Sequence, residues 1–204
     1  MTNSKLKVGL FGIGLNAYWK QFEGLEARLT GYLTEFSNQL KKQDAEIINV
    51  GLVDSTDKAF EAGDTFKRED VSIIFLYVTT YALSSTVLQA VSRAKVPVIV
   101  LNLSPASAID YTSFNKLNDR TKMTGEWLAY CSACPVPEIA NVFKRANIPF
   151  FQITGTLHND PEVEKEISEW IGAARVAHIL RYNRLGLMGN YYGCLLYTSP
   201  SPRD

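Results

Sequence analysis

Apolar residues along the chain fall into short continuous runs separated by longer runs with helical spacing. The clearest continuous run is Val71–Thr79, which is rich in β-branched and aromatic residues and has almost no polar alternation. A strand of this kind must be covered on both faces, as in parallel sheets packed between helices. Similar runs predict five more strands: Lys7–Phe11, Ala45–Val53, Lys95–Leu103, Ile148–Thr154 and Leu185–Tyr191.

The segments between these runs predict helices. The longest, from about Tyr18 to Lys42, repeats apolar residues every three or four positions. Asp54–Thr56 and Asp160 supply cap residues for two later helices. The other predicted helices pass through Phe60 and Ala62, cover Thr86–Ala94, Met123–Ala133 and Glu138–Ala146, and run from Pro161 to about Ile179. The regular alternation predicts an α/β fold with a doubly wound, mostly parallel sheet, a Rossmann-like or flavodoxin-like three-layer sandwich.

The composition changes towards the carboxyl end. We predict an amino-terminal α/β domain over residues 1–157, followed over residues 158–193 by a linking helix and the first strand of a second, truncated α/β domain. Cys194–Asp204 looks like the in-frame translation of a transposase adapter from shotgun sequencing. The alternative is a natural disordered tail rich in Ser and Pro. On the adapter interpretation, the chain is a fragment cut near Gly193.

Composition narrows the classes of protein to consider. The chain has 204 residues, 46% of them hydrophobic, and its 21 basic and 21 acidic side chains give no net charge. This balance disfavours partners such as nucleic acid or an anionic membrane. Met1–Lys7 lacks the apolar region of a secretory signal, and no apolar run reaches membrane-spanning length. Three cysteines without framework spacing suit a reducing compartment, so we expect a cytoplasmic protein.

Three motifs have a functional and a structural interpretation. Gly9–Gly14 lies at a strand-to-helix turn, but its glycine spacing is not that of a dinucleotide fingerprint and favours a tight turn. Cys131 and Cys134 form a C-x-x-C pair, which suits a redox motif or half a zinc site; packing of both thiols on a buried helical face is favoured. His158, in a loop beyond a strand, is more often solvated than a ligand or base.

The loops after the strands are where ligands bind in open α/β sheets. Thr80–Ser85 is rich in hydroxyl groups, and Asn16–Trp19 places an amide beside two large aromatic side chains. Such a platform suits sugars, although Tyr18 and Trp19 could equally pack a helix onto the sheet. The long polar connection Ser104–Lys122 is functional or ordered by a partner. Glu126 complements a helix dipole.

Several ordered segments carry a resemblance to a known family. They are Val8–Trp19, Phe75–Ser85, Pro97–Leu103, Leu117–Trp127 and Phe151–Thr156. In order and spacing they resemble the amino-terminal region of the L-arabinose isomerase and L-fucose isomerase superfamily, over essentially all of Leu6 to Gly193.

This resemblance implies a cytoplasmic aldose–ketose isomerase that acts on a pentose or deoxyhexose with a divalent metal, usually Mn²⁺. The metal-binding glutamates and histidines of such enzymes would lie beyond Gly193, so the fragment would be inactive alone. It would supply surfaces that enclose a small-molecule sugar and join the subunits of a homo-oligomer, such as a hexamer. No catalytic residue and no metal ligand is expected within this chain.

The resemblance also implies which side chains bind the substrate. These are Asn16, Tyr18, Trp19, Tyr81, Asp119, Lys122 and Tyr192. Bacterial arabinose isomerases have glutamine, leucine and histidine at the positions of Asn16, Tyr18 and Lys122, which puts arabinose specificity in doubt. The alternatives are a non-enzymatic sugar-binding or sugar-sensing lobe of the periplasmic-binding type and, more distantly, a flavodoxin-like electron carrier.

Overall fold

The computed structural model describes residues 5–183. Five strands form one sheet in the order β2-β1-β3-β4-β5, and every neighbouring pair is parallel. The strands are β1 (Lys7–Ile13), β2 (Glu46–Val53), β3 (Ile73–Tyr77), β4 (Val98–Ser104) and β5 (Phe150–Thr156). The predicted α/β fold with a parallel sheet between helices is therefore confirmed.

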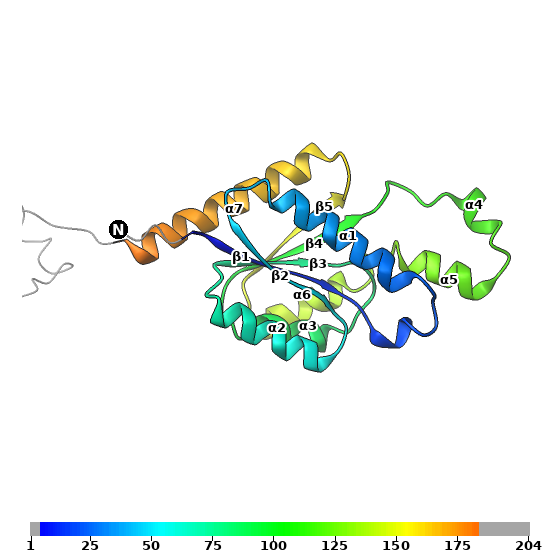
Figure 1. The fold of residues 1–204 in the computed structure, drawn as a ribbon, viewed down its shortest axis with the longest axis horizontal. Helices are drawn as coiled ribbons and strands as arrows, with labels where there is room; N and C mark the ends of the chain where they lie inside the picture. The colour runs from blue at the N-terminus through cyan, green and yellow to red at the C-terminus, as the bar shows by residue number, and fades with distance from the viewer. Residues whose placement is uncertain (1–4, 184–204) are drawn as a thin grey trace, which may run out of the picture.

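Helices cover both faces of the sheet (Figure 1). One layer contains α1 (Leu25–Leu40) and α7 (Pro161–Tyr182), and the other contains α2 (Thr56–Arg68), α3 (Ser84–Ser92) and α6 (Val136–Arg145). The short helix η1 (Asn16–Tyr18), α4 (Tyr111–Asn115) and α5 (Arg120–Leu128) lie beyond the carboxyl ends of the strands. In Figure 1, α4 and α5 extend well past the sheet as an arm.

The run at β3 forms the centre of the core. All five of its side chains are buried, and they alternate between the two helical layers. Ile74 and Leu76 join the cluster with α2, α3 and α6, whereas Phe75 and Tyr77 join the cluster with α1 and α7. The Tyr77 hydroxyl donates to the carbonyl of Leu103 at 3.3 Å. Burial raises the pKa of Tyr77 well above its ordinary value, so this hydroxyl stays protonated.

Some predicted boundaries are wrong for identifiable reasons. The helix expected from Tyr18 begins only at Leu25, because Gly24 adopts a left-handed conformation with φ of 79° before it. Gly12 and Ile13, expected in a turn, belong to β1. The connection Ser104–Lys122 contains a helix of its own, α4, and α5 ends at Leu128 rather than Ala133. Local turn geometry, which apolar spacing does not reveal, decides each boundary.

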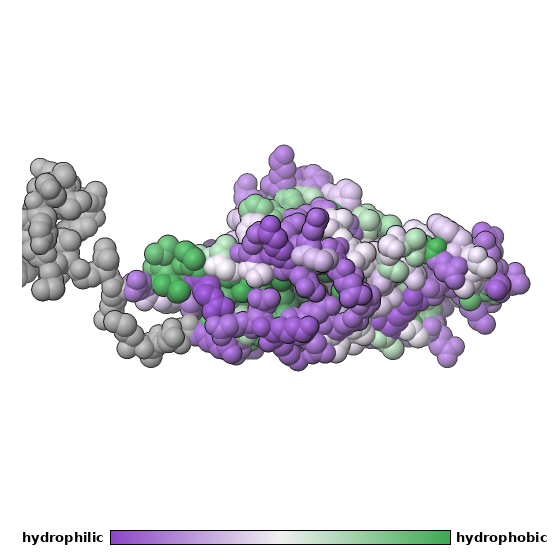
Figure 2. Space-filling model, turned by 90° about the horizontal axis from the view of Figure 1, so that it is seen from above, coloured by the Kyte–Doolittle hydropathy of each residue, from purple (hydrophilic) through white to green (hydrophobic). Residues whose placement is uncertain are grey.

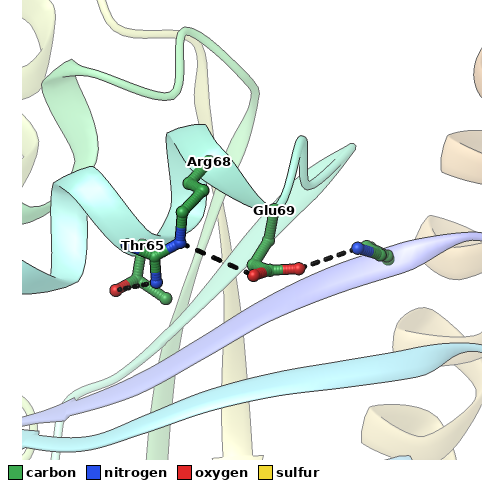
Figure 3. A network of polar contacts seen from close by, with 4 residues as sticks. Thr65, Arg68 and Glu69 are labelled. Carbon is green, nitrogen blue, oxygen red and sulfur yellow. Dashed lines mark hydrogen bonds and ion pairs between the residues drawn. The ribbon is translucent and has the colours of Figure 1, made fainter.

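The amino edge of the sheet is held by a small network of charged side chains (Figure 3). Glu69, which follows α2, accepts a hydrogen bond from Lys7 of β1 at 2.8 Å and lies 3.7 Å from Arg68. Arg68 in turn donates to Thr65. The bond from Lys7 holds the pKa of Glu69 below its ordinary value, and the same bond raises the pKa of Lys7. The network fastens the end of α2 to the start of β1.

The carboxyl-terminal end of α7 presents an apolar surface. Val176, Ile179 and Leu180 are all exposed there, and Figure 2 shows this region as a green area beside the grey atoms. The predicted strand Leu185–Tyr191 and the start of a second domain lie outside the described residues. Within residues 5–183, no helix combines the length and the hydropathy that a membrane span requires.

Candidate functional site

The strand order places a topological switch point between β1 and β3. The chain leaves β1 towards β2 on one side, while β3 and the later strands lie on the other. Ligands of doubly wound sheets bind in the crevice beyond this point. Trp19 packs against the end of β1, since a Cβ atom added at Gly14 would lie 2.7 Å from the Trp19 ring. Gly14 is therefore needed for this close approach.

A buried carboxylate holds Trp19 in place. Asp54 follows β2, is 4% exposed, and accepts a hydrogen bond from the Trp19 indole at 2.8 Å. The Lys58 ammonium group pairs with the same carboxylate oxygen, also at 2.8 Å. The sequence predicted that Asp54–Thr56 caps a helix, and the side chain that caps α2 is Ser55. The second role, as anchor for Trp19, has no signal in the local sequence.

The hydroxyl groups after β3 bond within the protein rather than lining a cavity. Thr79 donates to the carbonyl of Ile13, and Thr80 donates to the carbonyl of Leu128 at 2.8 Å. Ser84 and, at 3.4 Å, Tyr81 donate to the carboxylate of Glu138. The bond from Ser84 lowers the pKa of Glu138. This loop therefore fastens α6 and the end of α5 to the sheet.

The open space lies beside the switch point. A cleft of about 530 Å³ lies between the start of α1 and the start of α5. Its volume is within the range of small-molecule sites. The lining side chains and backbone come from two segments: Gln21, Phe22, Glu23, Gly24, Leu25 and Arg28 from the first, and Leu117, Asp119, Thr121, Lys122, Gly125 and Glu126 from the second.

An ion pair connects the two walls of the cleft. The Arg28 guanidinium group donates to both carboxylate oxygens of Glu126, at 2.5 and 3.2 Å, and its Nε donates to the Tyr32 hydroxyl at 2.7 Å. It also lies 5.4 Å from the centre of the Tyr130 ring. Partial burial works to lower the pKa of Arg28, but Glu126 and Tyr32 outweigh it and the net pKa is raised. The sequence predicted only a dipole role for Glu126.

The structure brings two of the predicted substrate residues into the cleft. Asp119 caps α5 by accepting a hydrogen bond from the backbone N–H of Lys122 at 2.9 Å, and both residues line the cavity. The Lys122 ammonium group and the Glu23 carboxylate have no ion-pair partner within residues 5–183. The cleft thus offers one available charge of each sign.

The other predicted residues lie beside the cleft or outside the described part. Tyr18 and Trp19 pack with Leu25, Leu29 and Leu128, which joins the cleft walls to the sheet. Burial, and secondarily the proximity of Tyr81, raises the pKa of Tyr18. Asn16 is exposed at the start of η1. Tyr192 lies outside the described residues, so its role stays a prediction.

The histidines and cysteines form no metal centre in this part of the chain. His158 follows β5, the edge strand opposite β2, and lies 2.7 Å from Glu35. His178 of α7 lies 3.1 Å from Ser72, just before β3. Cys131 and Cys134 form a disulfide, so the prediction that both thiols pack on a buried helical face is wrong. Among residues 5–183, no three His, Cys, Asp or Glu side chains gather as metal ligands.

Comparison with known proteins returns similar structures but no family. No protein-family model matches the chain, and no curated protein matches it. One solved structure with some similarity is a "putative acylhydrolase" from Bacteroides fragilis, 13% identical over 88% of this chain and 90% of that one, with a TM-score of 0.46. Another is a GDSL-like lipase from Bacteroides thetaiotaomicron, 12% identical over 84% and 88% of the two chains, with a TM-score of 0.40.

These findings correct the classification that the sequence suggested. The names of these two structures, a "putative acylhydrolase" and a "GDSL-like lipase", point to a different superfamily from the L-arabinose and L-fucose isomerases. The comparisons contradict the interpretation of the chain as part of an aldose–ketose isomerase, because no family model and no curated protein supports it and the two structures have other names. The sugar-binding lobe of the periplasmic-binding type gains no support either. Part of that resemblance, such as Phe75–Tyr77 within β3, is buried strand of a kind that parallel α/β sheets share. At these identities and TM-scores, the two structures assign no function to the chain.

Proposed function

We propose that this domain binds a small zwitterionic metabolite of the amino-acid class in the cleft between α1 and α5. The observation that carries the proposal is the pair of available opposite charges in that cleft, Lys122 for a carboxylate and Glu23 for an ammonium group. Phe22 and Leu117 add apolar surface for the rest of the ligand.

The charges already paired in the cleft support this ligand class. Arg28 and Glu126 neutralise each other, and Asp119 is engaged as the cap of α5. A polyanion would meet the carboxylates of Glu23, Asp119 and Glu126, which outnumber the cationic groups of Arg28 and Lys122. A compact molecule that carries one charge of each sign avoids this repulsion.

The position of the cleft also suits a binding role. The cleft lies at the carboxyl side of the sheet, where α/β domains bind ligands, and both of its walls begin at helix N-termini. The N-cap residue of α1, Gly24, has no side chain to satisfy the first N–H groups of the helix. The N–H of Leu25 already donates to the carbonyl of Phe22 at 3.2 Å, so the N–H groups that follow it are the donors for a ligand carboxylate.

The test is a thermal-shift screen of the purified chain against the twenty amino acids. A ligand at about one hundred times its Kd stabilises the folded state by about 2.7 kcal/mol, which raises the Tm by several degrees. For each ligand that does so, the matched amine without the carboxylate and the matched acid without the amine are expected to fail. Equal shifts by all three would show that opposite charges are not what the site recognises.

Two variants test whether the ligand binds in the cleft. Lys122→Ala removes the cation from the cleft, so the affinity in calorimetry is expected to fall about tenfold or more. Lys144→Ala removes an exposed cation from α6, on the other layer, and is expected to leave the affinity unchanged. Equal losses in both variants would exclude the cleft as the site.

A second candidate activity, hydrolysis of an activated ester, rests on one contact. Ser72 Oγ lies 3.1 Å from Nδ1 of His178, a distance that suits a nucleophile and its general base. The pair lies at the amino edge of the sheet and is separate from the cleft. If it acts, turnover of p-nitrophenyl acetate disappears in Ser72→Ala and persists in Ser85→Ala, an exposed serine of α3. Identical rates for both variants would remove this candidate.

A further inference from the structure

The turn between α5 and α6 contains a disulfide between Cys131 and Cys134. Cys131 and Cys134 are three residues apart, their Cα atoms lie 5.7 Å apart, and they follow the last residue of α5, Leu128, and precede the first residue of α6, Val136. A ring this short constrains less of the unfolded chain than a long loop does, so its contribution to global stability is at the low end for a disulfide. The bond therefore calls for another explanation than stabilisation.

The two sulfur-bearing residues differ sharply in exposure. Cys131 is 3% exposed, whereas Cys134 is exposed to solvent. An external thiolate therefore has better access to Cys134 than to Cys131. This division of roles is what thiol–disulfide exchange requires, with one accessible sulfur and one protected resolving thiol.

The place of Cys134 in the fold also favours exchange. It lies two residues before α6, a helix of ten residues, and the positive end of the helix dipole stabilises a thiolate there. Glu138 is the acidic residue in the first turn of α6. Its carboxylate accepts hydrogen bonds from the Ser84 hydroxyl at 2.5 Å and from the Ser84 backbone N–H at 3.2 Å. Its repulsion of a thiolate at Cys134 is thereby reduced.

We propose that Cys131–Cys134 is an exchangeable redox site, in which a low-molecular-weight thiol or a dithiol protein attacks Cys134 and Cys131 is the resolving thiol. The attacking thiolate forms a bond to Cys134 Sγ while the bond between the two cysteines breaks, and its electron pair leaves on Cys131 Sγ, which takes a proton from water. A second thiolate then attacks the external sulfur of the mixed disulfide, and Cys134 leaves as a thiolate that takes a proton from water. The site gains two electrons and two protons, and two external thiols become one disulfide.

The exchange would act on the wall of the ligand cleft. Leu128, three residues before Cys131, accepts the hydrogen bond from the buried Thr80 through its carbonyl, and Tyr130, next to Cys131, lies under the Arg28 guanidinium group. Opening the ring frees the backbone between these contacts and the start of α6. This consequence rests on the proposed function, whereas the exchange itself is independent of any ligand.

The experiment follows the thiols of the whole chain directly. Because Cys194 lies outside the described residues, it is replaced by serine in every sample. The folded protein is equilibrated in buffers of graded ratio of reduced to oxidised glutathione, quenched with acid and alkylated, and thiols are counted by mass spectrometry. We expect two thiols to appear together at ratios that leave a buried structural disulfide intact, with unchanged far-ultraviolet circular dichroism. A bond that opens only in denaturant would overturn the proposal.

The site of attack is tested in two ways. With a limiting amount of reduced glutathione, peptide mapping of the trapped adduct is expected to find it on Cys134, and an adduct mainly on Cys131 would overturn the assignment. This measurement needs no variant at either cysteine. In addition, Cys131→Ser is expected to form a mixed disulfide with oxidised glutathione about tenfold faster than Cys134→Ser, because the remaining thiol is exposed in the first variant and buried in the second.

Discussion

The sheet body and the arm formed by α4 and α5 are built in opposite ways. In the body, both faces of the sheet are covered, and β3 is buried along its whole length. In the arm, Tyr111 and Trp127 are 65% and 46% exposed, and α4 has no buried residue. The candidate cleft lies where the two regions meet. The body therefore supplies stability, whereas the arm supplies surface and one wall of a site.

The largest expected effect comes from truncating an aromatic side chain in each region. Phe36 of α1 is fully buried against Phe75 and Tyr77, so Phe36→Ala should lower the free energy of unfolding by about 3–5 kcal/mol. Trp127→Ala in the arm should change it by less than about 0.5 kcal/mol. Urea denaturation of both variants measures the difference. Similar losses would show that the arm is part of the cooperative core.

A pair of glycines sharpens the comparison within the body. A Cβ atom at Gly63 of α2 would lie 2.9 Å from the backbone carbonyl oxygen of Gln89 in α3, so Gly63→Ala should cost about 1–3 kcal/mol through overpacking. At Gly31 of α1, an added Cβ atom meets nothing within 4 Å. Gly31→Ala should therefore stabilise the protein by about 0.5–1 kcal/mol. Thermal unfolding of the two variants gives opposite signs if the helix contacts are correct.

The ion pair between Arg28 of the body and Glu126 of the arm should have an intermediate effect on the free energy of unfolding. Arg28→Met removes the ion pair with Glu126 while keeping an apolar stem, and should cost about 1 kcal/mol, since the pair is partly exposed. Glu126→Gln and the double variant complete a double-mutant cycle measured in urea. Additive losses would show that the two walls of the cleft are not coupled through this pair.

The smallest effect is a dependence of stability on pH at Glu138. The Ser84 hydrogen bond holds the pKa of Glu138 below its ordinary value of 4.5, so the carboxylate form is favoured by folding. The resulting stabilisation is complete above pH 4.5 and is lost as the pH falls through the lower folded-state pKa. The Tm of Glu138→Gln should therefore differ from that of the native chain more at pH 6 than at pH 3. A difference that does not change with pH would contradict this assignment.

The sequence predicts the sheet body much better than the arm. A continuous apolar run such as the one around Phe75 can be buried on both faces only between two helical layers, so this pattern determines the fold class. The start of α1 was missed because it depends on the backbone conformation of Gly24. Contacts between distant residues leave no local pattern. Arg28 and Glu126 are 98 positions apart, and Trp19 and Asp54 are 35 apart, so the walls of the cleft emerge only in three dimensions.

The separation of Trp19 from the cleft has a consequence for how such a protein can change over time. Asp54 and Gly14 hold Trp19 against the ends of β1 and β2, while the cavity lies between the starts of α1 and α5. Exposed side chains there, such as Lys122 and Thr121, can be replaced without disturbing the packed layers. Mutation could therefore redirect what the cleft recognises while the scaffold stays constant. The proposed ligand specificity is therefore free to evolve faster than the fold.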